Sequence, residues 1–172
     1  SNIETFTRHN VTRIVTHCPH CLNSLRHDYS QVGGKLEVVH HSQFLAELVS
    51  TGRLVFPDSQ SDTDVGSVAY HDPCYLARVN GIVDAPRELL AHVGARLTEM
   101  PRHGCRTACC GAGGGRMWLD DTPDQRIGQD RIDEVLETGT ETVVVSCPFC
   151  RTMSGDGSAA RGTETPVKSW PK

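Results

Sequence analysis

The feature of this sequence that most limits its possible folds is a set of five cysteines in the second half of the chain. Cys74 is followed after 34 residues by the adjacent pair Cys109 and Cys110, and after 36 more by Cys147 and Cys150 in a C-x-x-C pair. The five thiols therefore come from three separate segments. If they act together, the fold must bring three loops to one place, and metal or redox chemistry explains them better than a disulfide scaffold.

The segment after the adjacent cysteines carries four glycines in five positions, Gly111, Gly113, Gly114 and Gly115. Glycine lets backbone N–H groups approach a bulky anionic group and donate hydrogen bonds to its sulfur atoms. Two neighbouring thiolates can bind or bridge two metal atoms, and five thiolates are one more than a tetrahedral zinc ion takes. The pattern therefore favours an iron–sulfur cluster held by the cysteines and the glycine loop.

Hydrophobic periodicity predicts alternating short strands and helices, which indicates an α/β fold. We expect Ser42 and Thr122 to cap the helices that they begin. Cysteines follow several of the strands, so the cysteine loops are expected at the carboxyl ends of parallel strands. The predicted strands are 11–16, 36–41, 67–70, 95–100 and 141–146, and the predicted helices are 2–10, 19–29, 42–52, 85–94 and 122–139.

An internal repeat organises the chain. Residues 13–25 (RIVTHCPHCLNSL) and 142–154 (TVVVSCPFCRTMS) both predict a strand, a C-P-aromatic-C pair and a helix. We therefore expect two similar βαβ-type units with parallel-rich sheets. Residues 1–60 would be the later half of a first unit truncated upstream, residues 61–155 a complete second unit, and residues 156–172 a flexible tail. In this scheme Cys18 and Cys21 are the closing pair of the first site and are also candidate metal ligands.

Charge and hydropathy exclude two classes of protein. The net charge is −4 and there is no cluster of lysine and arginine, so we expect no nucleic-acid partner. The longest apolar runs are far shorter than the roughly 20 residues that cross a bilayer. The sequence therefore predicts a soluble, cytoplasmic chain.

Three motifs carry a family resemblance: HDPCYLAR around Cys74, CCGAGGGRMW from Cys109, and CPFCRTM from Cys147. Here the sequence resembles the CCG, or cysteine-rich, domain family over residues 66–155, and residues 3–56 resemble the later half of a second copy. Members of this family include the B subunit of heterodisulfide reductase, the iron–sulfur subunit of glycolate oxidase, and a group of bacterial membrane-bound iron–sulfur reductases. The resemblance to the C-terminal part of this last group is the strongest.

The resemblance implies an electron-transfer domain of an oxidoreductase. It implies a [4Fe-4S] cluster, noncubane in the heterodisulfide reductase branch, with Cys74, Cys109, Cys110, Cys147 and Cys150 as ligands. It further implies upstream iron–sulfur and membrane domains in the parent chain at the cytoplasmic face of the membrane. Electrons would pass from an electron-transfer flavoprotein, or from the oxidation of an organic acid, towards quinone, and the isolated fragment would be inactive.

Alternatives to the cluster remain open in the sequence. Zinc could organise a non-catalytic docking domain of the same complex, or the C-x-x-C pairs could carry out thiol–disulfide exchange. Zinc could also be held by Cys18, Cys21 and one nearby histidine, with His17, His20, His40 and His41 as candidates. His71 precedes Cys74 and is a candidate cofactor-binding residue, through a hydrogen bond to a ligand sulfur. Cys105 lies outside the five-cysteine pattern, and we expect it to be a free, partly buried thiol.

Overall fold

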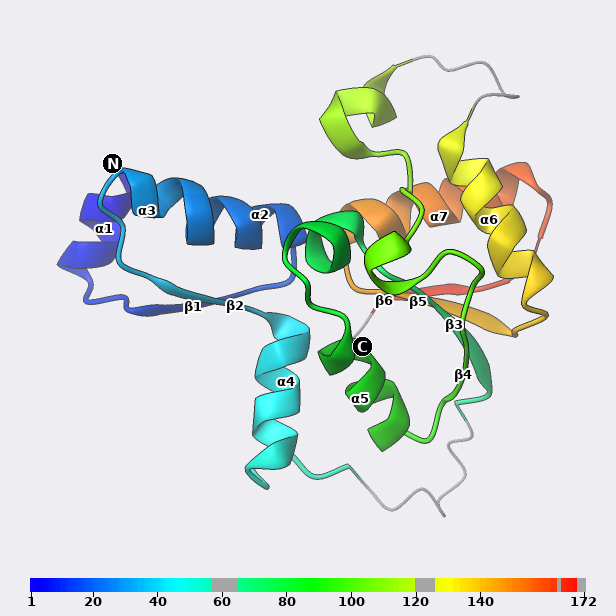
Figure 1. The fold of residues 1–172 in the computed structure, drawn as a ribbon, viewed down its shortest axis with the longest axis horizontal. Helices are drawn as coiled ribbons and strands as arrows, with labels where there is room; N and C mark the ends of the chain where they lie inside the picture. The colour runs from blue at the N-terminus through cyan, green and yellow to red at the C-terminus, as the bar shows by residue number, and fades with distance from the viewer. Residues whose placement is uncertain (57–64, 120–125, 164, 170–172) are drawn as a thin grey trace.

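All the strand pairings are parallel in the part of the chain that the computed structural model describes, residues 1–56, 65–119, 126–163 and 165–169. Two sheets form (Figure 1). The first pairs β1 (Arg13–Thr16) with β2 (Glu37–His40), and the second has the order β4 (Arg96–Thr98), β3 (Ser67–His71), β5 (Thr142–Val145), β6 (Val167–Ser169). This confirms the predicted α/β class with two units of parallel strands.

The two central strands of the larger sheet, β3 and β5, are buried along almost their whole length. Parallel strands that are covered on both faces consist of continuous apolar runs rather than alternating ones. The β-branched run at residues 142–145 fits this requirement because branched side chains pack well on a pleated surface. In Figure 1, α6 and α7 lie together on one side of this sheet.

Helices and helical turns connect the strands. α2 continues through a π-helical turn, η1, into α3, so the predicted helix 19–29 is present but irregular in its second half. The bounds of the helices are α1 (Asn2–Arg8), α2 (Pro19–Asn23), η1 (Ser24–Asp28), α3 (Tyr29–Gln31), α4 (His41–Ser50), η2 (Tyr75–Val79), α5 (Asp84–His92), η3 (Gly104–Arg106), η4 (Gly113–Trp118), α6 (Ile127–Glu137) and α7 (Pro148–Ala160). None of the described helices is long and apolar enough to cross a membrane.

The helix caps differ from those predicted. His40, not Ser42, is the N-cap of α4, since its Nδ1 accepts a hydrogen bond from the Ser42 backbone N–H at 3.4 Å. The Gln43 side chain accepts one from the His40 backbone N–H at 3.2 Å, which completes a capping box. The predicted cap Thr122 lies outside the described residues.

Residues 156–172, where the sequence suggested a flexible tail, contain regular structure. α7 extends to Ala160, and β6 pairs with β5 in parallel. The glycines and serines that obscure the pattern in the sequence have a packing role. A Cβ atom at Gly157 would lie 2.8 Å from the Ile132 Cγ1 atom of α6, so only glycine lets the two helices approach this closely.

The two units share an apolar cluster. Leu22 and Val38 come from the first unit and pack with Leu76 and Ile82 of the second. Burial of these apolar side chains against one another stabilises the contact between the two units.

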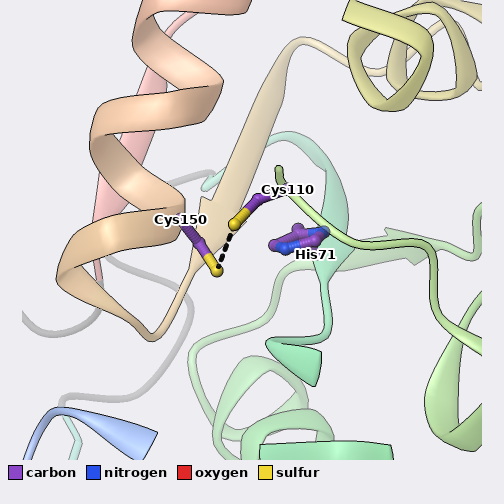
Figure 2. A group of neighbouring side chains, drawn as sticks. All are labelled: His71, Cys110 and Cys150. Atoms are coloured by element: carbon purple, nitrogen blue, oxygen red, sulfur yellow. Dashed lines mark hydrogen bonds between the residues drawn. The ribbon is translucent and has the colours of Figure 1, made fainter. Parts of the chain in front are cut away.

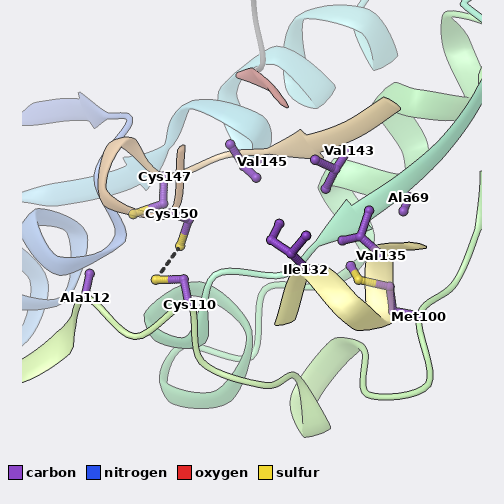
Figure 3. Packing of buried hydrophobic residues seen from close by; sticks show 10 residues of the cluster. All are labelled: Ala69, Met100, Cys110, Ala112, Ile132, Val135, Val143, Val145, Cys147 and Cys150. Carbon is purple, nitrogen blue, oxygen red and sulfur yellow. Dashed lines mark hydrogen bonds between the residues drawn. The ribbon is translucent and has the colours of Figure 1, made fainter. Parts of the chain in front are cut away.

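A second cluster fills the space between the larger sheet and α6. Ala69, Val143 and Val145 line it from the sheet, and Ile132 and Val135 from α6 (Figure 3). Three cysteines belong to the same cluster and gather at one end of it: Cys110, Cys147 and Cys150. The core therefore supports the cysteine loops directly.

Candidate metal centre

Three cysteines, Cys18, Cys74 and Cys147, lie within three residues of the carboxyl end of a strand. β3 ends at His71, three residues before Cys74, and β5 ends at Val145, two residues before Cys147. Because neighbouring parallel strands end at the same edge of a sheet, these two loops meet there. β1 delivers Cys18 in the same way, so the predicted placement of cysteine loops at strand carboxyl ends is confirmed.

The five cysteines of the second unit come together in a row of thiols, Cys74, Cys109, Cys110, Cys150 and Cys147, which we call the thiol row. The Cys150 Sγ atom donates to the Cys110 Sγ atom at 3.4 Å (Figure 2). Along the rest of the row each thiol changes the pKa of its neighbour by a direct sulfur–sulfur hydrogen bond. All eight cysteines of the chain are free thiols.

Two members of the thiol row are stabilised as thiolates. Hydrogen bonds from Cys110 and then Cys74 lower the pKa of Cys109 well below its ordinary value. Cys150, followed by His20, lowers the pKa of Cys147 to about 5. Their neighbours show the opposite effect, since Cys109 raises the pKa of Cys110 to about 11. Thiolates are the metal-binding form of cysteine, so Cys109 and Cys147 already favour the form that a metal would require.

The glycine loop contributes backbone N–H groups to this site. The Gly111 N–H donates to the Cys109 Sγ atom at 3.3 Å, and the backbone of Gly113 also lowers the Cys109 pKa. Gly111 has a φ of +91°, and a Cβ atom there would lie 3.3 Å from the Gly128 backbone nitrogen. Gly114 and Gly115 instead provide the positive φ angles that turn the chain in η4. Two of the four predicted glycines thus contact a cysteine, and the other two shape the loop.

His71 lies beside the thiol row. One of its ring nitrogens and the sulfurs of Cys110 and Cys150 all lie within 4.8 Å of one another (Figure 2). The side chain is only 1% exposed, and its Nδ1 atom accepts a hydrogen bond from the Nε atom of Arg131 at 2.8 Å. Burial, followed by the charge of Arg131, lowers the His71 pKa to about 3, so the ring is neutral.

Asp72 anchors the loop that carries the adjacent cysteines. Its carboxylate accepts two hydrogen bonds from Arg87, at 2.8 and 2.9 Å, and one from the Gly104 backbone N–H at 2.7 Å. The Thr107 hydroxyl donates to the Asp72 backbone carbonyl at 2.9 Å. A buried carboxylate with this many donors holds the segment before Cys109 against the end of β3.

The first C-x-x-C pair reaches the thiol row through His20. Cys147, and then Cys18, raise the His20 pKa to about 9. The His20 ring packs on Tyr75 at 4.2 Å and edge-on to Phe149 at 5.5 Å between ring centroids. Cys18 is buried, whereas Cys21 is exposed. The first pair therefore adjoins the second site but does not join the row.

Several residues of the site lie outside the sequence motifs, and Arg131 is one of them. It lies on the buried face of α6, together with Ile132 and Val135. A charged residue in phase with apolar ones on a predicted helix is a signal that the sequence does offer, since buried charges need partners. Cys105 is a free thiol as predicted, but the residue is exposed and not partly buried. Its thiol donates to the Ala77 carbonyl oxygen at 3.6 Å.

The donor set fits an iron–sulfur cluster. Five thiols that can ionise, a backbone N–H aimed at one sulfur and a neutral histidine beside two others are the groups that bind and tune such clusters. The described residues also leave the His71 Nε2 atom buried and without a hydrogen-bond partner. A buried polar atom without a partner, close to two ligand candidates, indicates that an additional group belongs at this position.

The known proteins that this chain resembles include oxidoreductases and a reductase subunit. The chain is 38% identical to the EtfAB:quinone oxidoreductase of Syntrophomonas wolfei subsp. wolfei, over 97% of this chain and 24% of that protein. It is 39% identical to the probable iron-sulfur-binding oxidoreductase FadF of Bacillus subtilis, over 98% of this chain and 24% of that protein. It is also 32% identical to the D subunit of the dihydromethanophenazine:CoB--CoM heterodisulfide reductase of Methanosarcina barkeri, over 97% and 41%. The chain thus spans about a quarter of the length of the first two relatives.

The family comparison covers both parts of the molecule. The Cysteine-rich domain family, CCG, matches residues 1–26 and 68–154. The first segment contains Cys18 and Cys21, and the second contains the complete thiol row. Since these segments make up more than half of the chain and include every cysteine that the sequence pattern singled out, this chain belongs to the cysteine-rich domain (CCG) family.

Proposed function

We propose that this chain is an iron–sulfur electron-transfer domain of an oxidoreductase. The observation that carries the proposal is the thiol row, in which five cysteines from three loops lie in contact at one sheet edge. One relative is named as a probable iron–sulfur-binding oxidoreductase and another as an EtfAB:quinone oxidoreductase, and both names support the proposal. A bound cluster would supply one-electron transfer.

The chain's own residues have three tasks in this function. The thiol row would hold the iron atoms, with Cys74, Cys109, Cys110, Cys147 and Cys150 as ligands. The Gly111 N–H would stabilise negative charge on the Cys109 sulfur, which it already contacts. Cys110, Cys147 and Cys150 are almost fully buried, so the surrounding core would keep water from most of the ligand sulfurs.

We further propose a cluster type, an electron donor and acceptor, and a location for this domain. Five ligands, two of them adjacent, suit a noncubane [4Fe-4S] cluster better than a four-ligand cubane. The name of one relative, EtfAB:quinone oxidoreductase, suggests electron-transfer flavoprotein as donor and quinone as acceptor. A relative named as a probable membrane-anchored ferredoxin supports a location at the membrane. We further propose that this is its cytoplasmic face, next to iron–sulfur and membrane domains of the same chain. Residues 1–60 and 61–155 would then be the later half of one CCG unit and a complete second unit.

The proposal is tested by metal analysis of the chain prepared and reconstituted without oxygen. We expect about four iron atoms and four sulfides per chain, together with a visible absorption spectrum. Cys110→Ser should lose most of the iron because Cys110 is the centre of the thiol row. Cys105→Ser is the matched control, since Cys105 is exposed and outside the row, and should keep the full iron content. Equal iron loss in the two variants would overturn the assignment.

A second candidate function is a zinc-stabilised docking domain. The observation in its favour is the His71, Cys110 and Cys150 group, whose potential ligand atoms lie within 4.8 Å of one another. Zinc binds histidine and cysteine readily, and a structural zinc ion would be colourless. About one zinc per chain after anaerobic reconstitution, with no iron and no visible absorption, would favour this function over electron transfer.

A further inference from the structure

We infer that Arg131 is a positioning residue that fixes His71 as an N–H donor towards the sulfurs of Cys110 and Cys150 and thereby prevents His71 from binding metal. The effect on a cluster rests on the proposed function. The state of the histidine ring does not, because it is a property of the protein alone.

A hydrogen bond joins the side chains of Arg131 and His71. The Arg131 Nε–H donates to the His71 Nδ1 atom at 2.8 Å, and arginine has no acceptor with which to reverse the bond. A ring nitrogen that accepts a hydrogen bond carries a lone pair and no proton. The neutral ring must therefore carry its proton on Nε2, the atom that is buried without a partner in the described part of the chain.

Other hydrogen bonds hold the Arg131 side chain in place, so the arginine cannot rotate away from the His71 Nδ1 atom. The Arg131 side chain is 2% exposed. One terminal nitrogen donates to the Arg102 backbone carbonyl at 2.9 Å and to the Glu134 carboxylate, and the other donates to the Thr107 hydroxyl at 3.3 Å. The guanidinium fork is thus fixed by bonds on every nitrogen.

This geometry excludes His71 as a metal ligand. A metal ion takes the lone pair of a neutral imidazole nitrogen. Binding through Nε2 would move the proton to Nδ1, where it would face the Arg131 N–H, and two donors would then point at each other. Zinc at His71, Cys110 and Cys150 is disfavoured for this reason, although the distances alone would allow it.

The same geometry favours a cluster bound through sulfur. Arg131 already occupies Nδ1, so Nε2–H is the donor that the ring can offer to the sulfurs of Cys110 and Cys150, which lie within 4.8 Å of a ring nitrogen and become negatively charged in a cluster. Reduction adds negative charge, and a donor to ligand sulfur stabilises the reduced form and raises the reduction potential. Arg131 would therefore tune the potential without touching the cluster.

The first experiment is ¹⁵N NMR of the reduced, metal-free 172-residue chain with ¹⁵N-labelled histidine. We expect the His71 ring to be protonated on Nε2 and unprotonated on Nδ1 at neutral pH. Arg131→Gln should lose this preference. Arg102→Gln is the matched control, since Arg102 also pairs with Glu134 but does not contact His71 by its side chain, and it should keep the preference. A ring protonated on Nδ1 in the unaltered chain would overturn the inference.

The second experiment measures metal preference and potential. Cobalt(II), a spectroscopic substitute for zinc, should gain a histidine ligand in Arg131→Gln and not in Arg102→Gln. In the cluster-loaded chain, His71→Leu removes the donor but keeps the arginine charge, and should lower the equilibrium constant for reduction about tenfold. This corresponds to about 59 mV for one electron. An unchanged potential in His71→Leu would contradict the role of the donor.

The unaltered chain provides a test that does not depend on the folding of any variant. Pulsed EPR on the cluster-loaded, ¹⁵N-histidine-labelled chain separates a nitrogen bound to iron from one that only donates to sulfur. We expect the weak coupling of a donor, and a strong coupling of His71 to iron would overturn the inference. Failure to bind iron at all would refute the proposed function, while the NMR result would still decide the state of His71.

Discussion

The backbone N–H of a single glycine, Gly111, helps to position the Cys109 sulfur. Gly111 places its N–H 3.3 Å from the Cys109 Sγ atom and has a φ of +91°, a region that side chains with a Cβ atom rarely occupy. A Cβ atom there would also lie 3.3 Å from the Gly128 backbone nitrogen of α6, a contact tight enough to require a small shift. Gly113, in contrast, has open space where a Cβ atom would be. Neighbouring glycines in the same loop therefore have different physical reasons to be glycine.

We predict that Gly111→Ala lowers the free energy of unfolding of the reduced, metal-free chain by about 2 kcal/mol, because alanine strains the backbone at positive φ. Gly113→Ala keeps its backbone N–H and should change stability by less than about 0.5 kcal/mol. Urea titration of both variants checks the prediction. Equal losses would mean that the loop is not held against α6 as described.

The helices and strands around the site are positioned by small residues as much as by apolar ones. α6 and α7 approach closely because Gly157 faces Ile132 and the Gly128 carbonyl, with no room for a side chain. This contact stabilises α7. Cys147 is the N-cap of this helix, and Cys150 lies in its first turn. Sequence periodicity predicts the existence of α6, but it cannot reveal that a glycine in the next helix is a contact site, since the hydrophobic pattern contains no information about partners.

We predict that Gly157→Ala lowers the free energy of unfolding by about 1–3 kcal/mol, because the methyl group would lie 2.8 Å from the Ile132 Cγ1 atom. Gly155→Ala in the same helix meets nothing within 4 Å and should raise stability by up to about 1 kcal/mol through helix propensity. Opposite signs in thermal or urea unfolding would confirm the contact. A stabilising effect of both variants would contradict it.

Contacts between the two units hold the molecule together, and His40, a fully buried polar side chain, makes one of them. It caps α4, and its Nε2 atom lies 3.2 Å from the Ser146 carbonyl oxygen at the end of β5. Burial, followed by the charge of His41, lowers the His40 pKa to about 3. The α4 cap therefore requires a neutral ring, in which Nδ1 accepts from the Ser42 N–H and the Nε2–H donates to the Ser146 carbonyl oxygen.

We predict that the reduced, metal-free chain loses stability as the pH falls from about 6.5 towards 3. The sign follows from linkage: in this range the unfolded chain, with an ordinary histidine pKa near 6.5, binds a proton that the folded His40 ring does not accept. His40→Gln should have a smaller loss of stability between pH 7 and pH 5. His9→Gln, at an exposed position, should keep the slope of the unaltered chain. Identical slopes in all three proteins would refute this role of His40.

The sequence was sufficient for the α/β class, the position of the cysteine loops at strand ends and the family, because these depend on local periodicity and on the spacing of reactive residues along the chain. The family comparison and the parallel sheets confirm these predictions. The ligand set itself stays a prediction, although the structure brings all five cysteines into one row.

The tertiary structure alone revealed what surrounds that row. Arg131 lies 60 residues from His71 in the chain, and His20 lies far from Cys147, so neither contact follows from a local pattern. Each depends on how a helix packs against a sheet, and packing is set by the volume and direction of many side chains at once. A buried cation that fixes a histidine is for this reason visible only when the chain has folded.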